Sequence, residues 1–285
     1  MTTPTYTTLI EPRELAALID ADPSVAIIDC RHDLARPDWG SEAFAASHIP
    51  GAVFAHLDRD LSGPVTPDSG RHPLPDPDRL AATFGRWGIG SETQIVVYDQ
   101  ATGAYAARLW WLARYLGHTR VAVLNGGLAA WQSAGLPVTA ASSVRPLRHF
   151  VGRPQLAWVV SAREVADGLE RGDSVLIDAR AADRFAGRNE TVDPVAGHIP
   201  GARNHPFGEN LDAESRFLAR RELESRWRQT LSGAAPRSAV LMCGSGVTAC
   251  HNLLAMELAG LSGARLYAGS WSEWIRDPAR PVTTS

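Results

Sequence analysis

The sequence contains no lysine: all 28 of its basic residues are arginine, against 31 acidic residues and a formal net charge of −3. Because proteins that bind nucleic acids usually carry a basic excess, this balance argues against nucleic acid as a partner. Long apolar runs are absent as well, since no stretch approaches the roughly 18 residues that a membrane span needs. The N-terminal sequence has neither the basic start nor the apolar run of a secretory signal. We therefore expect a cytoplasmic protein with no membrane partner.

Cysteine is scarce, with three residues at positions 30, 243 and 250. An odd number at these spacings fits neither a disulfide framework nor a CxxC pair. A structural zinc site needs four ligands at close, paired spacings, and no such pattern occurs. We expect neither disulfides nor a bound metal, and we interpret Cys250 as a small buried hydrophobe.

Two copies of one pattern organise the chain. Four pairs of blocks match in the same order: AIIDCR with VLIDAR, SHIPGA with GHIPGA, IVVYD with AVLMC, and VAVLNGGLAAW with ARLYAGSWSEW. Between the copies, residues 139–155 have no clear period and are rich in Ser, Pro and Arg, as a linker is. The sequence thus predicts a first domain over residues 1–138, a linker over 139–155 and a second domain over 156–285.

Within each copy, short aliphatic runs such as QIVVY alternate with longer amphipathic stretches such as RELAALID. Buried strands that alternate with helices are typical of crossover units in a parallel sheet. The predicted fold class is α/β, with two tandem domains, each a mostly parallel sheet flanked by helices on both faces.

One loop combines the features of a reactive site. The strand SAVLM leads into CGSGVTA (243–249), and an apolar helical pattern follows. A cysteine at the carboxyl end of a strand and ahead of a helix meets the positive end of the helix dipole. Gly244 and Gly246 allow the backbone to curl, so that N–H groups of the loop, including those of Val247 and Thr248, form an anion-binding nest. This setting favours the thiolate of Cys243 as a nucleophile, and we expect the Thr248 hydroxyl to cap the helix.

In combination these motifs resemble the rhodanese superfamily, in particular its tandem-domain sulfurtransferases. The resemblance rests on DCR and DAR, both HIPGA blocks, GRHPLP at residues 70–75, the loop at Cys243 and GSWSEW near the end, and so spans nearly the whole chain. It implies transfer of a sulfane sulfur through a persulfide on Cys243, with no metal or organic cofactor. The loop is similar to that of 3-mercaptopyruvate sulfurtransferases. Thiosulfate-preferring relatives commonly have basic residues where this chain has Gly244 and Ser245.

The first copy departs from this pattern at the position of the nucleophile. Asp99 stands where the second copy has Cys243, and a carboxylate cannot hold a sulfane sulfur. We therefore expect a non-catalytic first domain, in which Asp99 has a structural role in a degenerate loop.

The resemblance also implies residues for the substrate. Arg184, in DARAADRF, matches the arginine that binds the donor carboxylate in the family, a task suited to a bidentate guanidinium. Arg188 is the candidate for the second arginine of relatives. Ser245 is expected to relay a proton to the carbon product, paired with the histidine of the first HIPGA block, His48. Because His198 occupies the same motif in the second copy, a second interpretation stays open, in which both histidines only brace a turn.

The expected reaction moves sulfur from 3-mercaptopyruvate to a thiol acceptor, such as thioredoxin or a small thiol, or to cyanide. Two alternatives remain: a thiosulfate:cyanide sulfurtransferase, and a non-enzymatic module that carries sulfur or binds a partner. A rhodanese-fold phosphatase fits poorly, because its longer loop ends in an arginine where this chain has Ala249.

Overall fold

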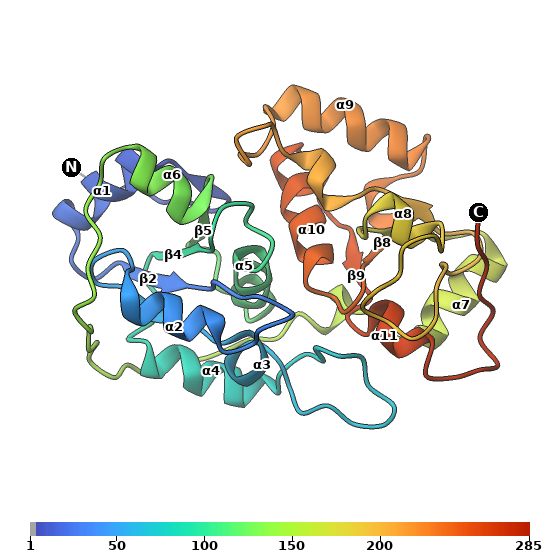
Figure 1. The fold of residues 1–285 in the computed structure, drawn as a ribbon, viewed down its shortest axis with the longest axis horizontal. Helices are drawn as coiled ribbons and strands as arrows, with labels where there is room; N and C mark the ends of the chain where they lie inside the picture. The colour runs from blue at the N-terminus through green and yellow to red at the C-terminus, as the bar shows by residue number, and fades with distance from the viewer. Residues whose placement is uncertain (1–3) are drawn as a thin grey trace. The chain divides into compact units, whose positions relative to one another are not determined.

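The computed structural model describes residues 4–285; residues 1–3, which belong to the expected first domain, lie outside the described residues. The chain divides into two compact units, each containing one parallel sheet (Figure 1). Of the described residues, the first unit comprises 4–63 together with 75–155 and 213–216. The second comprises 64–74, 156–212 and 217–285.

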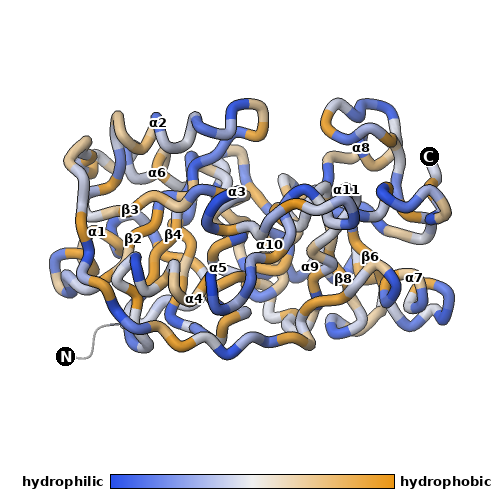
Figure 2. The backbone as a smooth tube through the Cα atoms, turned by 90° about the horizontal axis from the view of Figure 1, so that it is seen from below, coloured by the Kyte–Doolittle hydropathy of each residue, from blue (hydrophilic) through white to orange (hydrophobic). Residues whose placement is uncertain are grey.

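The first unit is built on five strands in the order β1-β5-β4-β2-β3, and all neighbouring pairs are parallel. Its strands are β1 (Leu9–Ile10), β2 (Ala26–Asp29), β3 (Val53–Phe54), β4 (Ile95–Tyr98) and β5 (Val121–Leu124). Its helices are α1 (Pro12–Ala21), α2 (Trp39–Ala46), α3 (Leu57–Asp60), α4 (Pro77–Arg86), α5 (Ala106–Tyr115) and α6 (Gly127–Ser133). Figure 2 shows α2 and α6 on one side of the strands, and α4 and α5 on the other.

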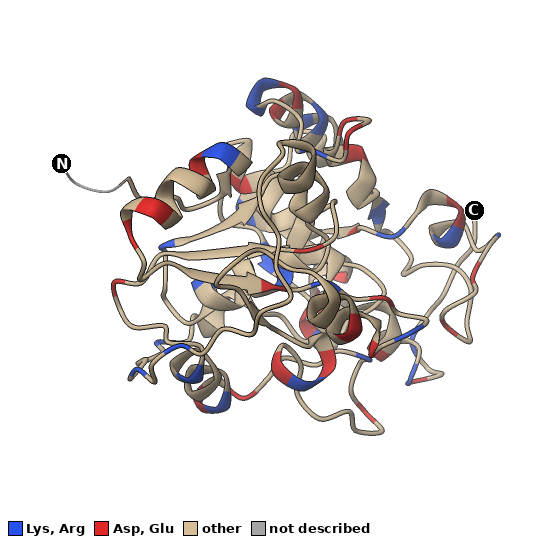
Figure 3. Ribbon diagram, turned by 60° about the vertical axis from the view of Figure 1, so that its left-hand side comes forward, with Lys and Arg blue, Asp and Glu red and all other residues tan. Residues whose placement is uncertain are grey.

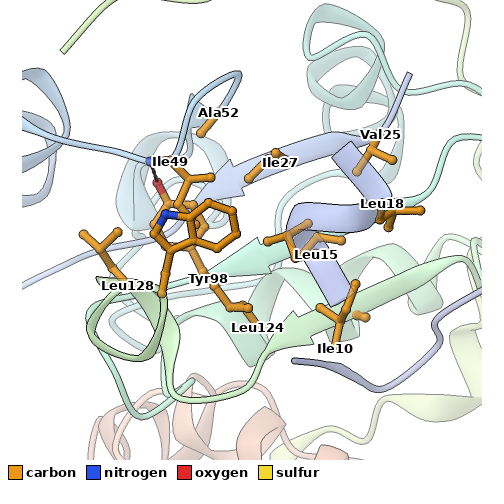
Figure 4. Close-up of a cluster of buried hydrophobic side chains, with 13 residues drawn as sticks. Ile10, Leu15, Leu18, Val25, Ile27, Ile49, Ala52, Tyr98, Leu124 and Leu128 are labelled. Atoms are coloured by element: carbon orange, nitrogen blue, oxygen red, sulfur yellow. Dashed lines mark hydrogen bonds between the residues drawn. The ribbon is translucent and has the colours of Figure 1, made fainter. Parts of the chain in front are cut away.

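Apart from Asp29 at the end of β2, the central strands of this sheet are hydrophobic, because helices cover both faces. Every residue of β2, β4 and β5 is buried. On one face, Leu15 of α1 and Trp131 of α6 pack in a single cluster with Ile27 of β2 and Tyr98 of β4. The Tyr98 hydroxyl accepts the backbone N–H of Ile49 at 3.2 Å, which ties the first HIPGA turn to this core (Figure 4).

The second unit repeats the design with four strands in the order β7-β6-β8-β9, again all parallel. Its strands are β6 (Val175–Asp178), β7 (Arg203–Asn204), β8 (Ala239–Met242) and β9 (Arg265–Leu266). Its α-helices are α7 (Ala162–Arg171), α8 (Ala182–Phe185), α9 (Arg220–Leu231), α10 (Thr248–Leu258) and α11 (Ser270–Trp274). Three 3-10 helices complete it: η1 (Leu156–Trp158), η2 (Phe207–Asn210) and η3 (Pro236–Ser238). The predicted α/β fold with two parallel sheets and flanking helices is confirmed.

The two units differ from the expected domains in short segments. Residues 64–74, expected in the first domain, pack with the second unit, and residues 213–216 pack with the first. The expected linker, 139–155, forms no helix and no regular strand, but it packs along the first unit. The Arg145 guanidinium shows how, since it donates to the carbonyl oxygens of Ser24, Val25 and Trp87 at 2.6–3.0 Å.

Charged residues are concentrated on helices and loops (Figure 3). Helix α9 is an example, with Glu222–Arg226 and Glu224–Arg228 pairs of 2.8 Å on its outer side. Over residues 4–285, none of the helices is both long enough and apolar enough to cross a bilayer.

Candidate functional site

The loop after β8 directs backbone N–H groups at the sulfur of Cys243. The Cys243 Sγ accepts the N–H of Gly246 at 3.1 Å and that of Ser245 at 3.4 Å. Gly246 has a φ of +77°, and a Cβ there would lie 2.3 Å from the carbonyl oxygen of Ala268, so only glycine fits. Helix α10 begins at Thr248, within the CGSGVTA segment, and adds the positive end of its dipole. Both features favour a negative charge on the sulfur.

The expected hydroxyl cap on α10 is wrong. The N-cap is Val247, which makes no side-chain hydrogen bond, and Thr248 is already the first helical residue. A side chain inside the first turn cannot take the geometry of an N-cap.

Residues of the GSWSEW motif hold the Cys243 loop in place through hydrogen bonds. The Ser270 hydroxyl accepts the backbone N–H of Cys243 at 3.1 Å and donates to the carbonyl of Tyr267 at 2.9 Å. The N–H groups of Trp271 and Ser272 donate to the carbonyls of Cys243 and Gly244 at 3.0 and 2.9 Å. Ser270 takes a φ of +54°, unusual for a residue with a side chain, and the loop contacts account for it.

Trp271 itself is a packing residue. It is fully buried, its indole N–H donates to the carbonyl of Val195, and the Arg180 guanidinium lies 4.6 Å from its ring centre.

The GRHPLP segment brings a histidine to this loop. His72 Nδ1 lies 2.7 Å from Ser245 Oγ, and both residues are buried. Gly70 permits the approach, because a Cβ there would meet the carbonyl oxygen of Gly269 at 2.4 Å. The backbone N–H of Arg71 donates to the Ser272 hydroxyl at 3.0 Å, which fixes the segment at the start of α11.

The expected pairing of Ser245 with His48 is therefore wrong, and the physical reason is visible in both copies of the repeat. His48 is buried in the first unit, with Nδ1 2.6 Å from the carbonyl of Phe44 and its ring stacked on the Phe44 ring. His198 does the same in the second unit, with the carbonyl and ring of Phe185. The HIPGA histidines brace equivalent turns.

A row of ion pairs borders the loop. Arg184 Nη2 lies 2.8 Å from Glu190 Oε1 and 3.1 Å from Asp193 Oδ2, and Arg71 Nη1 lies 2.6 Å from Asp193 Oδ1. Glu190 also pairs with Arg180 at 3.4 Å. Burial raises the pKa of Glu190, but hydrogen bonds from Arg184 and from backbone N–H groups outweigh it, so the pKa is lowered. Both carboxylate side chains are only 2% exposed, whereas those of Arg184 and Arg71 are 21% and 30% exposed.

The predicted loop residues and Arg184 thus meet in one place, but Arg188 does not join them. A methyl group built on Gly244 would lie 3.2 Å from Arg71 Nη2 and 3.8 Å from Arg184 Nη2. Arg188 is instead exposed at the turn after α8, where its N–H donates to the carbonyl of Asp183.

Comparison with known proteins gives the family of the chain. The model of the Rhodanese-like domain matches residues 11–134 and 161–277. The chain belongs to the rhodanese-like family. A protein of Pseudomonas aeruginosa named "Probable 3-mercaptopyruvate sulfurtransferase" is 48% identical over 279 residues, which cover 97% of this chain and 98% of that protein. The thiosulfate sulfurtransferase of Gallus gallus is 34% identical over 239 residues, covering 82% and 80%.

A solved structure gives the same result. SseA from Escherichia coli, described among 3-mercaptopyruvate sulfotransferases, superimposes with a TM-score of 0.81 at 32% identity, covering 94% of this chain and 100% of that one. The resemblance seen in the motifs is confirmed, and the chain is a tandem rhodanese-like sulfurtransferase.

In the first rhodanese-like unit, a carboxylate fills the nest that a sulfur would occupy. Asp99 accepts four backbone N–H bonds, from Ala101, Gly103, Tyr105 and Ala106, at 2.9–3.3 Å. It is fully buried, and burial raises its pKa while the four N–H bonds act to lower it. The loop thus keeps its inward-facing N–H groups and satisfies them with its own side chain.

The other two cysteines are enclosed in the two units. Cys30 and Cys250 are 1% and 0% exposed. Burial, with the charges of Asp29 and Asp99, raises the pKa of Cys30 well above its ordinary value, so that thiol stays protonated. In the part of the chain from residue 4 onward, no three His, Cys, Asp or Glu side chains are grouped to hold a metal ion.

Sequence reasoning missed His72, Arg71, Asp193 and the two serines of GSWSEW. The sequence did contain one signal for His72 and Arg71. The stretch between the HIPGA block and the next strand is longer in the first copy, 53–94, than in the second, 203–238, and the additional residues include GRHPLP. An extra motif in the copy that lacks a nucleophile indicates a role beyond its own domain.

Proposed function

We propose that the protein transfers a sulfane sulfur from 3-mercaptopyruvate to a thiol or cyanide acceptor through a persulfide on Cys243. The Cys243 thiolate attacks the donor sulfur, an S–S bond forms, and the C–S bond breaks. Its electron pair leaves on carbon as the enolate of pyruvate, which takes up the proton of the donor thiol. The acceptor thiolate then attacks the outer sulfur and releases the Cys243 thiolate. Sulfur, protons and electrons balance without an added oxidant.

The observation that carries this choice of donor is the 2.7 Å contact between Ser245 Oγ and His72 Nδ1 beside the sulfur nucleophile. Protonating an enolate needs a positioned acid or a proton relay, and a hydroxyl hydrogen-bonded to an imidazole provides one. Thiosulfate leaves sulfite behind and has no carbon to protonate. A buried relay next to Cys243 has a task only in the mercaptopyruvate reaction.

The groups around the sulfur suit each stage of this chemistry. N–H groups of Ser245 and Gly246 stabilise the thiolate and, later, the persulfide anion. Arg184 lies at the loop edge, where a guanidinium can bind the donor carboxylate in two hydrogen bonds. To do so, it must share its donors with Glu190 and Asp193.

Thiosulfate is the second candidate donor, and one observation favours it. The Arg71 guanidinium lies beside Gly244 and so adds a positive charge to a loop that has no basic residue of its own. Nearby cations stabilise a compact bound dianion such as thiosulfate. A non-enzymatic carrier has less support, because an intact nest and a buried relay exceed what sulfur storage requires.

The deciding experiment compares kcat/KM for 3-mercaptopyruvate and thiosulfate on the purified protein and on Ser245→Ala. We expect the unaltered protein to prefer mercaptopyruvate, and Ser245→Ala to lose that reaction much more than the thiosulfate reaction. Preference of the unaltered protein for thiosulfate would overturn the proposed donor.

A further inference from the structure

Helix α10, which follows the Cys243 loop, has no polar face that would fix its rotation about its own axis. Its residues 249–256 are all buried, and most of them are apolar. A helix that is buried on all sides lacks the amphipathic pattern that selects one rotation. The two polar residues of this stretch, His251 and Asn252, are fully buried, and buried polar groups require hydrogen-bond partners. The partners of these two side chains therefore determine how α10 is oriented.

The buried side chain of Asn210, in η2, joins α10 to α9, which lie side by side in the second unit (Figure 1). Its Nδ2 donates to Asn252 Oδ1 at 2.7 Å and lies 3.3 Å from His251 Nδ1. Its Oδ1 accepts the indole N–H of Trp227 at 3.0 Å and lies 3.1 Å from His205 Nε2. An amide has two N–H donors and an oxygen with two lone pairs, so the hydrogen-bonding capacity of Asn210 is fully used.

The direction of these hydrogen bonds is fixed as well. The Trp227 indole N–H can only donate, so the oxygen of Asn210 faces α9 and its NH₂ group faces α10. Asn252 must then present its own oxygen to Asn210, and its Nδ2 donates to the backbone carbonyl of His205 at 2.9 Å. Turning α10 about its axis would break both bonds of Asn252 and leave buried amide groups without partners, which is costly. The cluster thus selects one rotation of α10, as a single buried asparagine selects the register of a coiled coil.

The first turn of the same helix is tied to the nest around the sulfur. Cys250 Sγ donates to the carbonyl of Gly246 at 3.3 Å, and the Cys250 N–H donates to the carbonyl of Val247 at 3.0 Å. Gly246 in turn donates its N–H to Cys243 Sγ at 3.1 Å. A rotation of α10 would therefore displace a donor that points at the sulfur. Because fixed dipoles stabilise a reacting charge only when they are aimed at it, such a displacement would weaken the nest.

We propose that Asn210 and Asn252 are positioning residues for Cys243, which act through α10 to hold the Gly246 N–H on the sulfur. The part of this inference that concerns sulfur transfer rests on the proposed function, whereas the effect on the sulfur itself does not depend on the donor.

The test compares Asn252→Ala with Thr230→Val, a matched control from the same cluster. The Thr230 hydroxyl lies 2.8 Å from His205 Nδ1 and donates to the carbonyl of Arg226 within α9. Each variant removes one polar side chain of the cluster, and thermal unfolding records the stability that each loses. The other readouts are the rate at which iodoacetamide alkylates Cys243 at pH 6, followed by mass spectrometry of its peptide, and the single-turnover rate of sulfur loading from 3-mercaptopyruvate.

The two variants should differ in the reactivity of the sulfur. We expect Asn252→Ala to slow alkylation and sulfur loading about 3- to 10-fold, the size of a weakened interaction between a thiolate and aligned dipoles. KM for 3-mercaptopyruvate should stay within about twofold, because the side chain of Asn252 is buried in the cluster and does not bind the donor. Thr230→Val should leave both rates within about twofold, even if it melts at a lower temperature than the unaltered protein, since its side chain is bound to α9 and His205.

Alkylation separates this inference from the function. If the unaltered protein fails to use mercaptopyruvate, the proposed donor is wrong, and the alkylation rates still decide whether Asn252 positions the sulfur nest. If alkylation of Asn252→Ala stays within twofold of the unaltered protein, the inference is wrong while the function stands. Equal slowing in Thr230→Val would indicate a loss of stability only and would overturn the inference too. Should Asn252→Ala fail to fold, Asn252→Leu, which keeps the volume of the side chain, decides by the same criteria.

Discussion

The imidazole Nδ1 of His72 lies 2.7 Å from the hydroxyl oxygen of Ser245, although 173 positions separate the two residues in the chain. The pair is buried in the second unit, whose loop carries Cys243, while His72 is contributed by the first half of the sequence. One short segment of the degenerate first copy thus packs with the second unit and contacts the loop that carries Cys243.

The first prediction concerns this pair. His72→Ala and Ser245→Ala should each lower kcat for 3-mercaptopyruvate by about 10²- to 10⁴-fold, the usual size of a general acid–base contribution. Loading from thiosulfate should change far less, because no carbon is protonated. Steady-state rates with both donors check this, with His149→Ala, at an exposed position, as the control. Equal losses with both donors would contradict the relay and indicate damage to the loop.

Sulfur loading should be confined to one cysteine. Only Cys243 combines N–H donors to sulfur with a helix N-terminus, whereas Cys30 is a buried thiol whose raised pKa keeps it protonated. Mass spectrometry after incubation with donor should find one added sulfur, on the peptide that contains Cys243. Cys243→Ala should abolish labelling and turnover. Cys30→Ser and Cys250→Ser should keep both, and loss of labelling in either, with the fold intact, would contradict the prediction.

Asp99 should matter for stability and not for sulfur chemistry. Asp99→Ala leaves four backbone N–H groups without their acceptor, and an unsatisfied buried donor costs about 1–3 kcal/mol. We expect a loss of at least about 2 kcal/mol in the free energy of unfolding, even if water enters the nest. Chemical denaturation measures it, with Asp38→Ala as the control, since Asp38 forms an exposed pair with Arg59. An unchanged unfolding midpoint would remove the structural role assigned to Asp99.

Buried histidines predict how stability depends on pH. His205 lies between Thr230 and Asn210, and burial lowers its pKa, although the Asn210 hydrogen bond acts to raise it. The unfolded chain then binds more protons than the folded one below about pH 6.5, so stability decreases as pH falls through that range. His118 adds to the same trend, because burial lowers its pKa as well.

Thermal unfolding at pH 5.5 and 7.5 tests whether stability decreases on acidification. The loss in Tm at the lower pH should be smaller in His205→Gln, which keeps a hydrogen-bonding side chain but does not titrate. A midpoint that rises on acidification would contradict the sign of the effect.

The fold could be predicted from sequence because local patterns determine it. Short apolar runs such as VAIID and SAVLM are buried strands, and the repeat gives the number of sheets. The loop that holds Cys243 could also be predicted, because the cysteine, its glycines and the following helix are contiguous in the chain. Local information is sufficient for both.

The rest of the site depends on contacts that are distant in sequence. His48 was a reasonable partner for Ser245 by motif, yet its ring stacks on Phe44 four residues away, just as His198 stacks on Phe185. The actual partner, His72, is brought near Ser245 because Gly70 can lie against Gly269. Neither periodicity nor motif spacing reports such a close backbone approach. The ion pairs of Arg184 could not be predicted from a sequence pattern either, because Asp193 and Glu190 lie in an irregular turn.

A fragment of residues 156–285 tests how much the second half can do by itself. It contains the nest, GSWSEW and Arg184, so the N–H groups that hold the Cys243 sulfur remain. It lacks residues 64–74 and therefore both His72 and Arg71, which leaves Ser245 without its imidazole and Asp193 with Arg184 alone. We expect a folded fragment to accept sulfur from a reactive polysulfide but to turn over 3-mercaptopyruvate at least about 10²-fold more slowly than the full chain. Circular dichroism establishes that the fragment is folded, and the full-length His72→Ala/Arg71→Ala variant should reproduce its kinetics. A folded fragment that matched the full-length rate would show that the GRHPLP segment has no part in the reaction.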